Sequence, residues 1–157
     1  MFAKCALLLF AWMGLQTHAA YPDKPIRIVV PYPPGGTADI LARTIASKLP
    51  AVLGQPVIVD NRAGAGGNIG TDIVAKSKPD GYTLVVGLMN THVVNPALYA
   101  NMPFRGVDDF TPISQLAAVV TTMVIHPSVP ARSVRQFIDF AKANPGKLAY
   151  ASGGNGS

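Results

Sequence analysis

Short continuous apolar runs alternate with helix-spaced apolar positions through the first half of the chain. The run Ile26–Val30 is apolar and rich in β-branched residues, which is typical of a strand covered on both faces. After a turn rich in proline and glycine, apolar side chains recur at helical spacing at Ile40, Leu41, Ile45, Leu49 and Val52. Pro50 interrupts this pattern and predicts that the helix ends or kinks there.

The order of strand, glycine loop and helix then repeats. The stretch "GQPVIVD" predicts a second strand at Val57–Asp60, and the glycine loop "NRAGAGGNIG" leads into a short helix at Ile69–Lys76. The turn "KPDGY" precedes a third strand at Thr83–Gly87. This repeated order predicts an α/β fold with a doubly wound parallel sheet.

The second half of the chain has a less regular pattern. A loop with one helical turn near Pro96–Tyr99 is expected first, followed by the long apolar run Ile113–Ile125. A run of that length suits a strand that leaves one sheet and enters another. Ser133 and Gln136 form a capping-box pattern, which predicts a helix over Val134–Ala143.

The last residues predict a fifth short strand at Leu148–Ser152, followed by the glycine-rich "GGNGS". We therefore expect a first α/β lobe over residues 21–118. Residues 119–157 would supply a crossover strand and the incomplete start of a second lobe.

Residues 1–20 have the pattern of a secretory signal peptide. A lysine is followed by the apolar stretch Ala6–Leu15 and by Thr17-His18-Ala19, a small-x-small cleavage pattern. The apolar stretch is too short to span a bilayer, which needs about 20 residues. We expect cleavage before Ala20 or Tyr21 and a soluble exported protein; a buried N-terminal helix is the alternative.

Composition narrows the function. Cleavage would remove Cys5, the only cysteine, so neither a disulfide nor thiol chemistry is expected. The chain has a formal net charge of +5, and its basic residues are scattered singly. Nucleic acid is therefore a poor candidate partner. A mild positive charge suits small anions.

The stretch "PYPPGGTAD" at positions 31–39 is the strongest candidate for chemistry. Gly35 and Gly36 allow the backbone to approach a ligand closely, and the helix start at Thr37 adds unpaired N–H groups with a partial positive charge. The amides of Gly36, Thr37 and Ala38 are predicted to bind a carboxylate without a cationic side chain. The alternative is a tight turn with no ligand. Asp39 has two interpretations, stabilisation of the helix start or a contact with a ligand donor.

Other chemistry finds little support. "GAGGNIG" departs from the dinucleotide fingerprint, because the sixth position is Ile69 and the loop follows the second strand. We expect no cofactor, and no histidine has a metal-ligand spacing. His92 follows the third strand and is a candidate for lining a ligand cleft.

Six stretches resemble the Bug-type substrate-binding proteins, which are TctC-like periplasmic receptors of tripartite tricarboxylate transporters. They are "YPDKPIRIVVPYPPGGTAD", "LGQPVIVDNRAGAGGNIG", "KPDGYTLVVG", "NPALY", "FTPI" and "HPSVPARSV", in order along the chain from Tyr21 to Ser157. Ala63 departs from the family pattern, which commonly has proline there.

The resemblance implies a periplasmic-binding-protein-like fold of type II, a two-lobed Venus flytrap that holds a small carboxylate largely by backbone amides and water. Gly35, Gly36, Thr37 and Asp39 match the first ligand loop. Gly66 in the second glycine loop would face the same cleft edge, with Thr91 and His92 nearby. The second lobe's loop would place Ser152, Gly153, Gly154, Gly156 and Ser157 opposite.

The leading hypothesis is a receptor without catalysis that delivers a di- or tricarboxylate, or a similar anion, to membrane permease subunits. Family members are about twice as long as this chain, so a non-functional truncated receptor is a second hypothesis. A third is an α/β enzyme that acts on a carboxylate through Asp39 or His92.

Overall fold

The computed structural model describes residues 21–120 and 122–151, and its centre is a three-stranded parallel sheet. The strands are β1 (Ile26–Val30), β2 (Val57–Asn61) and β3 (Thr83–Val85), in the spatial order β2-β1-β3. The predicted strands and their parallel arrangement in one sheet are confirmed. β3 ends two residues earlier than predicted, although the Val86 amide still donates to the Val29 carbonyl at 3.0 Å.

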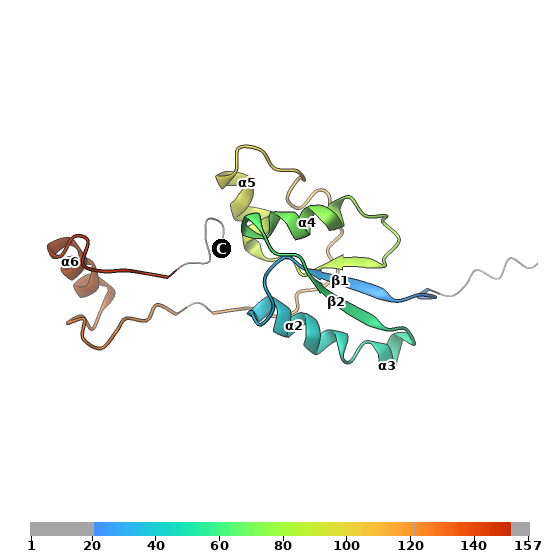
Figure 1. Cartoon of the computed structure of the whole chain (residues 1–157), viewed down its shortest axis with the longest axis horizontal. Helices are drawn as coiled ribbons and strands as arrows, with labels where there is room; N and C mark the ends of the chain where they lie inside the picture. Colours follow the sequence, from blue (N-terminus) through green and yellow to red (C-terminus); the bar gives the residue numbers. More distant parts are fainter. Residues whose placement is uncertain (1–20, 121, 152–157) are drawn as a thin grey trace, which may run out of the picture.

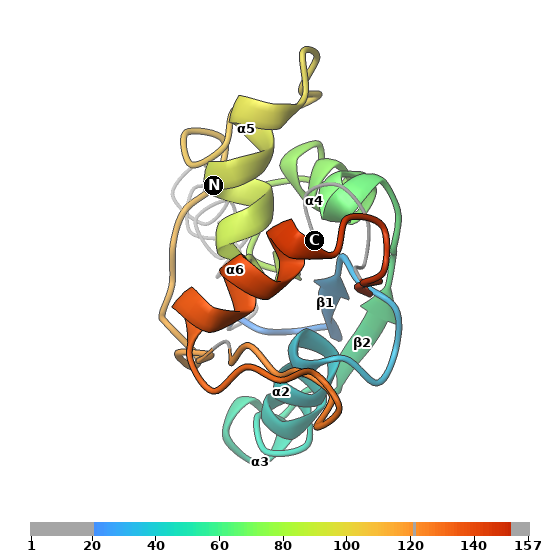
Figure 2. The same cartoon turned by 90° about the vertical axis from the view of Figure 1, so that its left-hand side faces the viewer.

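Helices cover both faces of this sheet (Figures 1 and 2). Helix α2 (Thr37–Ala46) lies on one side and α4 (Asn68–Ala75) on the other. On the α2 side, Ala38 and Ala42 pack against Ile28, Val30 and Val86 in a buried cluster. The result is an α/β/α arrangement around β1, the most buried strand.

Gly70 allows α4 to approach the end of β1. A Cβ atom at this position would lie 2.6 Å from the Arg62 carbonyl oxygen and 2.8 Å from the Pro31 Cα atom. Both neighbours are backbone atoms, so a side chain there would force the helix away from the sheet. Gly70, which stands one position after the sixth place of the dinucleotide fingerprint, is therefore required by packing.

The interruption predicted at Pro50 is present. Helix α2 ends at Ala46, and a separate short helix α3 (Pro50–Leu53) begins with Pro50, where a missing N–H costs nothing. Gly54 then ends α3 in the left-handed conformation, with φ of 69°.

Residues 88–98 contain more helix than predicted. A π-helical segment η2 (Asn90–Val94) leads directly into α5 (Asn95–Leu98), and a short 3₁₀ turn η1 (Ala65–Gly67) lies beside η2. The fully buried Asn95 ties them together, because its Nδ2 donates to the Gly66 carbonyl at 3.1 Å and to Asn68 Oδ1 at 2.7 Å.

Phe104 is the last buried residue along the described chain. None of the described residues from 111 to 151 is buried. The strands expected over Ile113–Ile125 and Leu148–Ser152 are not formed at 113–120, 122–125 or 148–151, since no neighbouring strand there offers backbone partners. Ser152 lies outside the described residues. The predicted boundary at residue 118 stays a prediction.

Helix α6 (Val134–Ala143) forms where it is predicted, and Figure 1 places it well away from the sheet. The Gln136 amide donates to Ser133 Oγ at 3.3 Å, as in a capping box, whereas the Gln136 side chain accepts from the Arg132 amide instead of from Ser133. Across the described ranges, no helix combines the length and the apolar character needed to cross a membrane.

Candidate functional site

The turn between β1 and α2 presents a row of amides at the carboxyl edge of the sheet. Gly35 has φ of +87°, a left-handed conformation that favours glycine, and Gly36 is the N-cap of α2. No described residue accepts a hydrogen bond from the amides of Gly36, Thr37 or Ala38. These are the orphan donors of a helix start, where an anion is favoured.

The Asp39 side chain holds this turn in place through hydrogen bonds. It is almost fully buried, and it accepts hydrogen bonds from the Gly35 amide at 2.9 Å and from Asn61 Nδ2 at 2.9 Å. Arg43 Nε contacts both carboxylate oxygens at 3.0 Å. Arg43 also donates to Asn61 Oδ1 at 3.0 Å, and Asn61 donates to the Tyr32 carbonyl at 3.1 Å. The turn is thus tied to both α2 and β2.

The charge of Asp39 is neutralised within this network. The hydrogen bond from Arg43, with those from Gly35 and Asn61, lowers the pKa of Asp39 to about 2. The carboxylate therefore stays ionised at neutral pH and is paired with a guanidinium. This geometry supports the structural interpretation of Asp39. Because the carboxylate is paired with Arg43, it repels an anion at the turn less than an unpaired carboxylate would.

The second glycine loop lies against the same edge. Gly66 and Gly67 both have positive φ, at 63° and 95°, and the Gly66 carbonyl is held by Asn95. A Cβ atom at Gly67 would lie 2.6 Å from Thr91 Cγ2 and 2.9 Å from the Tyr32 hydroxyl oxygen. Thr91 is fully buried, and its own hydroxyl donates to the Leu88 carbonyl at 3.1 Å. The loops after all three strands therefore meet here.

His92 is anchored to the segment 104–110. Its Nδ1 lies 2.9 Å from the Gly106 carbonyl, and its ring packs edge-on against Phe110 with centroids 4.8 Å apart. A Cβ atom at Gly87 would come within 2.6 Å of Nε2. These contacts fasten the 104–110 segment to the lobe, and a ligand role for His92 stays a prediction.

The structure brings together Gly35, Gly36, Thr37, Ala38, Asp39, Gly66 and Thr91 at one edge of the sheet. Ser152, Gly153, Gly154, Gly156 and Ser157 lie outside the described residues. Sequence reasoning missed three participants, Tyr32, Arg43 and Asn61. The spacing of four residues between Asp39 and Arg43 was an available signal for an ion pair on one helix.

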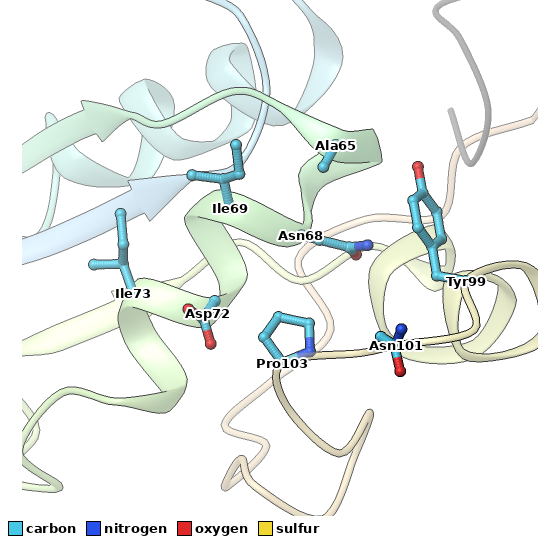
Figure 3. Close-up of a pocket in the computed structure, with 8 residues that line it drawn as sticks. All are labelled: Ala65, Asn68, Ile69, Asp72, Ile73, Tyr99, Asn101 and Pro103. Atoms are coloured by element: carbon cyan, nitrogen blue, oxygen red, sulfur yellow. The ribbon is translucent and has the colours of Figure 1, made fainter.

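A cavity of about 290 Å³ borders the second glycine loop (Figure 3). It lies between α4 and the segment 99–103, where Asn68 points toward Tyr99 and Asp72 lies beside Pro103. Asp72 Oδ1 is shielded from solvent and has no hydrogen-bond partner among the described residues. Within 21–120 and 122–151, no three His, Cys, Asp or Glu side chains gather closely enough to hold a metal ion.

Comparison with known families decides where the chain belongs. The family model described as the tripartite tricarboxylate transporter family receptor (TctC) matches residues 41–157. The chain belongs to this family. It is 40% identical over 156 residues to a UPF0065 protein of Bordetella pertussis, with 99% of this chain and 47% of that protein covered. Protein BugT of the same organism is 43% identical over 138 residues, covering 87% of this chain and 42% of BugT.

Solved structures agree with this assignment. A structure described as a periplasmic transporter matches with a TM-score of 0.69 and 40% identity, covering 83% of this chain and 44% of that one. Rpa4515 of R. palustris with adipate matches at 0.68 and 37%, with coverages of 82% and 43%. MatC of Rhodopseudomonas palustris with bound malate matches at 0.67 and 31%, with coverages of 78% and 42%.

These comparisons confirm the predicted family and the periplasmic-binding-protein-like α/β fold. The chain spans somewhat less than half the length of the relatives that it matches. The family is described as a receptor family, and its structural neighbours include proteins described as a periplasmic transporter and a periplasmic binding protein.

Proposed function

We propose that the chain forms the first lobe of an extracytoplasmic receptor that binds a small organic carboxylate. The ligand's carboxylate lies at the amides of Gly36, Thr37 and Ala38, and no catalysis takes place. One observation carries this proposal: three unpaired amides at a helix start, held rigid by the buried network around Asp39. Rigidity matters because a preformed turn loses little entropy when it binds.

Further support comes from the relatives. Two structural neighbours contain adipate and malate, both dicarboxylates. The family's name connects its members with tripartite transporters, so the proposed partners are the permease subunits of such a system. In this proposal residues 1–20 direct export to the periplasm, and residues 119–157 begin a second lobe that closes over the ligand.

An NMR titration tests the proposal even if a single lobe binds weakly. The ¹H–¹⁵N spectrum of the 157-residue chain is recorded with increasing adipate or malate, and with adipamide as the uncharged matched probe. We expect saturable shifts of the 36–38 amides with the acids and none with adipamide. Shifts that map elsewhere, or equal shifts with adipamide, would contradict the proposal.

Gly36→Val is the matching variant. Gly36 has φ of −78°, and a Cβ atom there meets only the Pro33 carbonyl oxygen at 3.8 Å, so a side chain fits without strain. The isopropyl group would stand between the ligand and the amides. We expect the lobe to keep its circular dichroism spectrum and to lose the response to acids, with Gly36→Ala intermediate. An undiminished response would mean that the turn connects β1 to α2 and does not bind the carboxylate.

A further inference from the structure

Tyr32 lies across the carboxyl end of the central strand. Its ring packs against the buried cluster that contains Val30 and Ala38, on the α2 side of the sheet. Its hydroxyl lies beside Gly67, the N-cap of α4, and Thr91 borders the same glycine. The phenol therefore spans the edge of the sheet from the first ligand loop to the second glycine loop.

The Tyr32 hydroxyl is buried and has no hydrogen-bond partner among the described residues. The Thr91 hydroxyl donates to Leu88 and the Gly67 carbonyl accepts from Thr71 at 2.9 Å, and neither forms a hydrogen bond with the Tyr32 hydroxyl. Buried polar atoms without a partner are rare in folded proteins and are destabilising. Burial raises the pKa of the Tyr32 phenol, so the hydroxyl remains a protonated donor at neutral pH.

This position coincides with the point where the strand order reverses. With the order β2-β1-β3, the chain leaves β1 toward one side for β2 and crosses to the other side for β3. Ligands of open α/β sheets bind outside the carboxyl ends of the strands at such a point. Tyr32 follows β1 and Thr91 follows β3, so the loops that flank the reversal are those that surround the hydroxyl.

We propose that the Tyr32 hydroxyl donates a hydrogen bond to an oxygen of the bound anion other than the carboxylate held at residues 36–38. The inference rests on the proposed function and narrows its ligand class. The amides lie at the start of α2, whereas the hydroxyl lies beside Gly67 at the start of α4. A ligand across this edge therefore meets both if it carries a second acceptor. Tyr32 selects dicarboxylates over monocarboxylates of the same length.

Access to the hydroxyl requires the second glycine loop to shift, because Gly67 lies against it. This loop contains Ala65 with φ of 47°, a left-handed conformation that is unfavourable for a non-glycine residue. A shift of this loop on binding would give the buried donor its partner.

Matched ligands and a conservative variant test the inference. The chain and its Tyr32→Phe variant are titrated with adipate and hexanoate, and with succinate and butyrate, each pair differing by one carboxylate. A hydrogen bond to a charged group predicts that Tyr32→Phe weakens binding of the dicarboxylate about tenfold or more. Binding of the monocarboxylate is expected to stay the same within about twofold.

Ligand-free stability supplies a second readout. Tyr32→Phe removes an unpartnered hydroxyl and keeps the ring, so the variant is expected to melt at the same temperature as the wild type or higher. Tyr82→Phe is the matched control at the other end of the sheet. The Tyr82 hydroxyl donates to Asp23 Oδ1 at 2.6 Å and accepts from the Asp23 amide at 2.9 Å, so this change lowers stability and leaves the ligand affinities unchanged.

The outcomes separate the two proposals. Unchanged affinity of Tyr32→Phe for the dicarboxylates would overturn the role of Tyr32 and leave the carboxylate site at the turn intact. An equal loss of affinity for the dicarboxylate and the monocarboxylate of a pair would also overturn it. The hydroxyl would then affect only the carboxylate site at residues 36–38. Failure of the wild-type chain to respond to any of the four acids would refute the proposed function, and this inference with it.

Discussion

Residues 21–110 and residues 111–151 use apolar side chains in opposite ways. In the first region Val29 and Val30 of the central strand are fully buried, and Phe104 is 4% exposed. In the second, Val120 and Val124 are 88% and 83% exposed, and none of the described residues is buried. Both regions contain apolar runs of a similar kind. An apolar run therefore indicates that a segment can form a buried strand, but it does not show which segment will cover it.

The difference also separates helices from strands. Helix α6 forms in the second region without a buried side chain, because its backbone hydrogen bonds and its Ser133 cap are all local. The run 113–125 forms no strand in its described part, since a strand's hydrogen bonds must come from a neighbour. Local signals suffice for one kind of element and not for the other.

The largest expected effect comes from removing two methyl groups in each region. Val29→Ala leaves a cavity beneath the central strand, where Val29 is 0% exposed, and should cost about 2–3 kcal/mol of the free energy of unfolding. Val124→Ala, at an exposed position, should stay within about 0.5 kcal/mol of the wild type. Urea denaturation measures both. Equal losses would show that residues 122–125 pack into a core in solution, which would contradict the contrast between a buried first region and an exposed second region.

The next effect concerns pH and the network around Asp39. Its pKa is about 2 in the folded state against an ordinary value of 3.8, so the ionised form stabilises the fold. A lowered folded pKa means that this contribution is complete above about pH 4 and is lost as the pH falls toward about 2. The stability difference between wild type and Asp39→Asn should therefore be largest at about pH 5 and shrink between about pH 4 and pH 2.

A matched change in the second region controls for this experiment. The Asp139 carboxylate lies on the exposed helix α6, 3.6 Å from Arg135 Nε, and exposed pairs of this kind contribute little. Asp139→Asn should leave the acid profile of the lobe unchanged. If Asp39→Asn shows the same pH-independent difference throughout, the ion pair with Arg43 does not hold the turn in solution.

Sequence patterns predicted most of the strands and helices of the lobe, because these elements alternate and are separated by turns rich in proline and glycine. They did not predict η2, which depends on Asn95 reaching Gly66 and Asn68 from far along the chain. The free amides of the turn followed from local composition. Asn61 did not, since its role depends on the register that places it opposite Val30 and so beside the Tyr32 carbonyl.

Tyr32 escaped prediction for a similar reason. In the sequence it is one aromatic residue among prolines, and nothing nearby indicates that its hydroxyl will meet Gly67 and Thr91. That meeting requires the loops after all three strands to converge, which only the assembled sheet provides. The domain boundary at residue 118 and the loop at residues 152–157 stay predictions, as the described contacts do not bear on them.

The smallest expected effect tests whether the second region is energetically independent. Ser133→Ala removes the side-chain oxygen that accepts from the Gln136 amide and should cost about 1 kcal/mol of local helix stability. Hydrogen exchange should quicken at the amides of residues 137–141 and remain unchanged at Ile28 and Val30, because no buried contact links α6 with the sheet. Ser114→Ala, in the exposed segment, should change neither set. Faster exchange in β1 after Ser133→Ala would mean that the two regions unfold together. The difference in burial between them would then not make their stabilities independent.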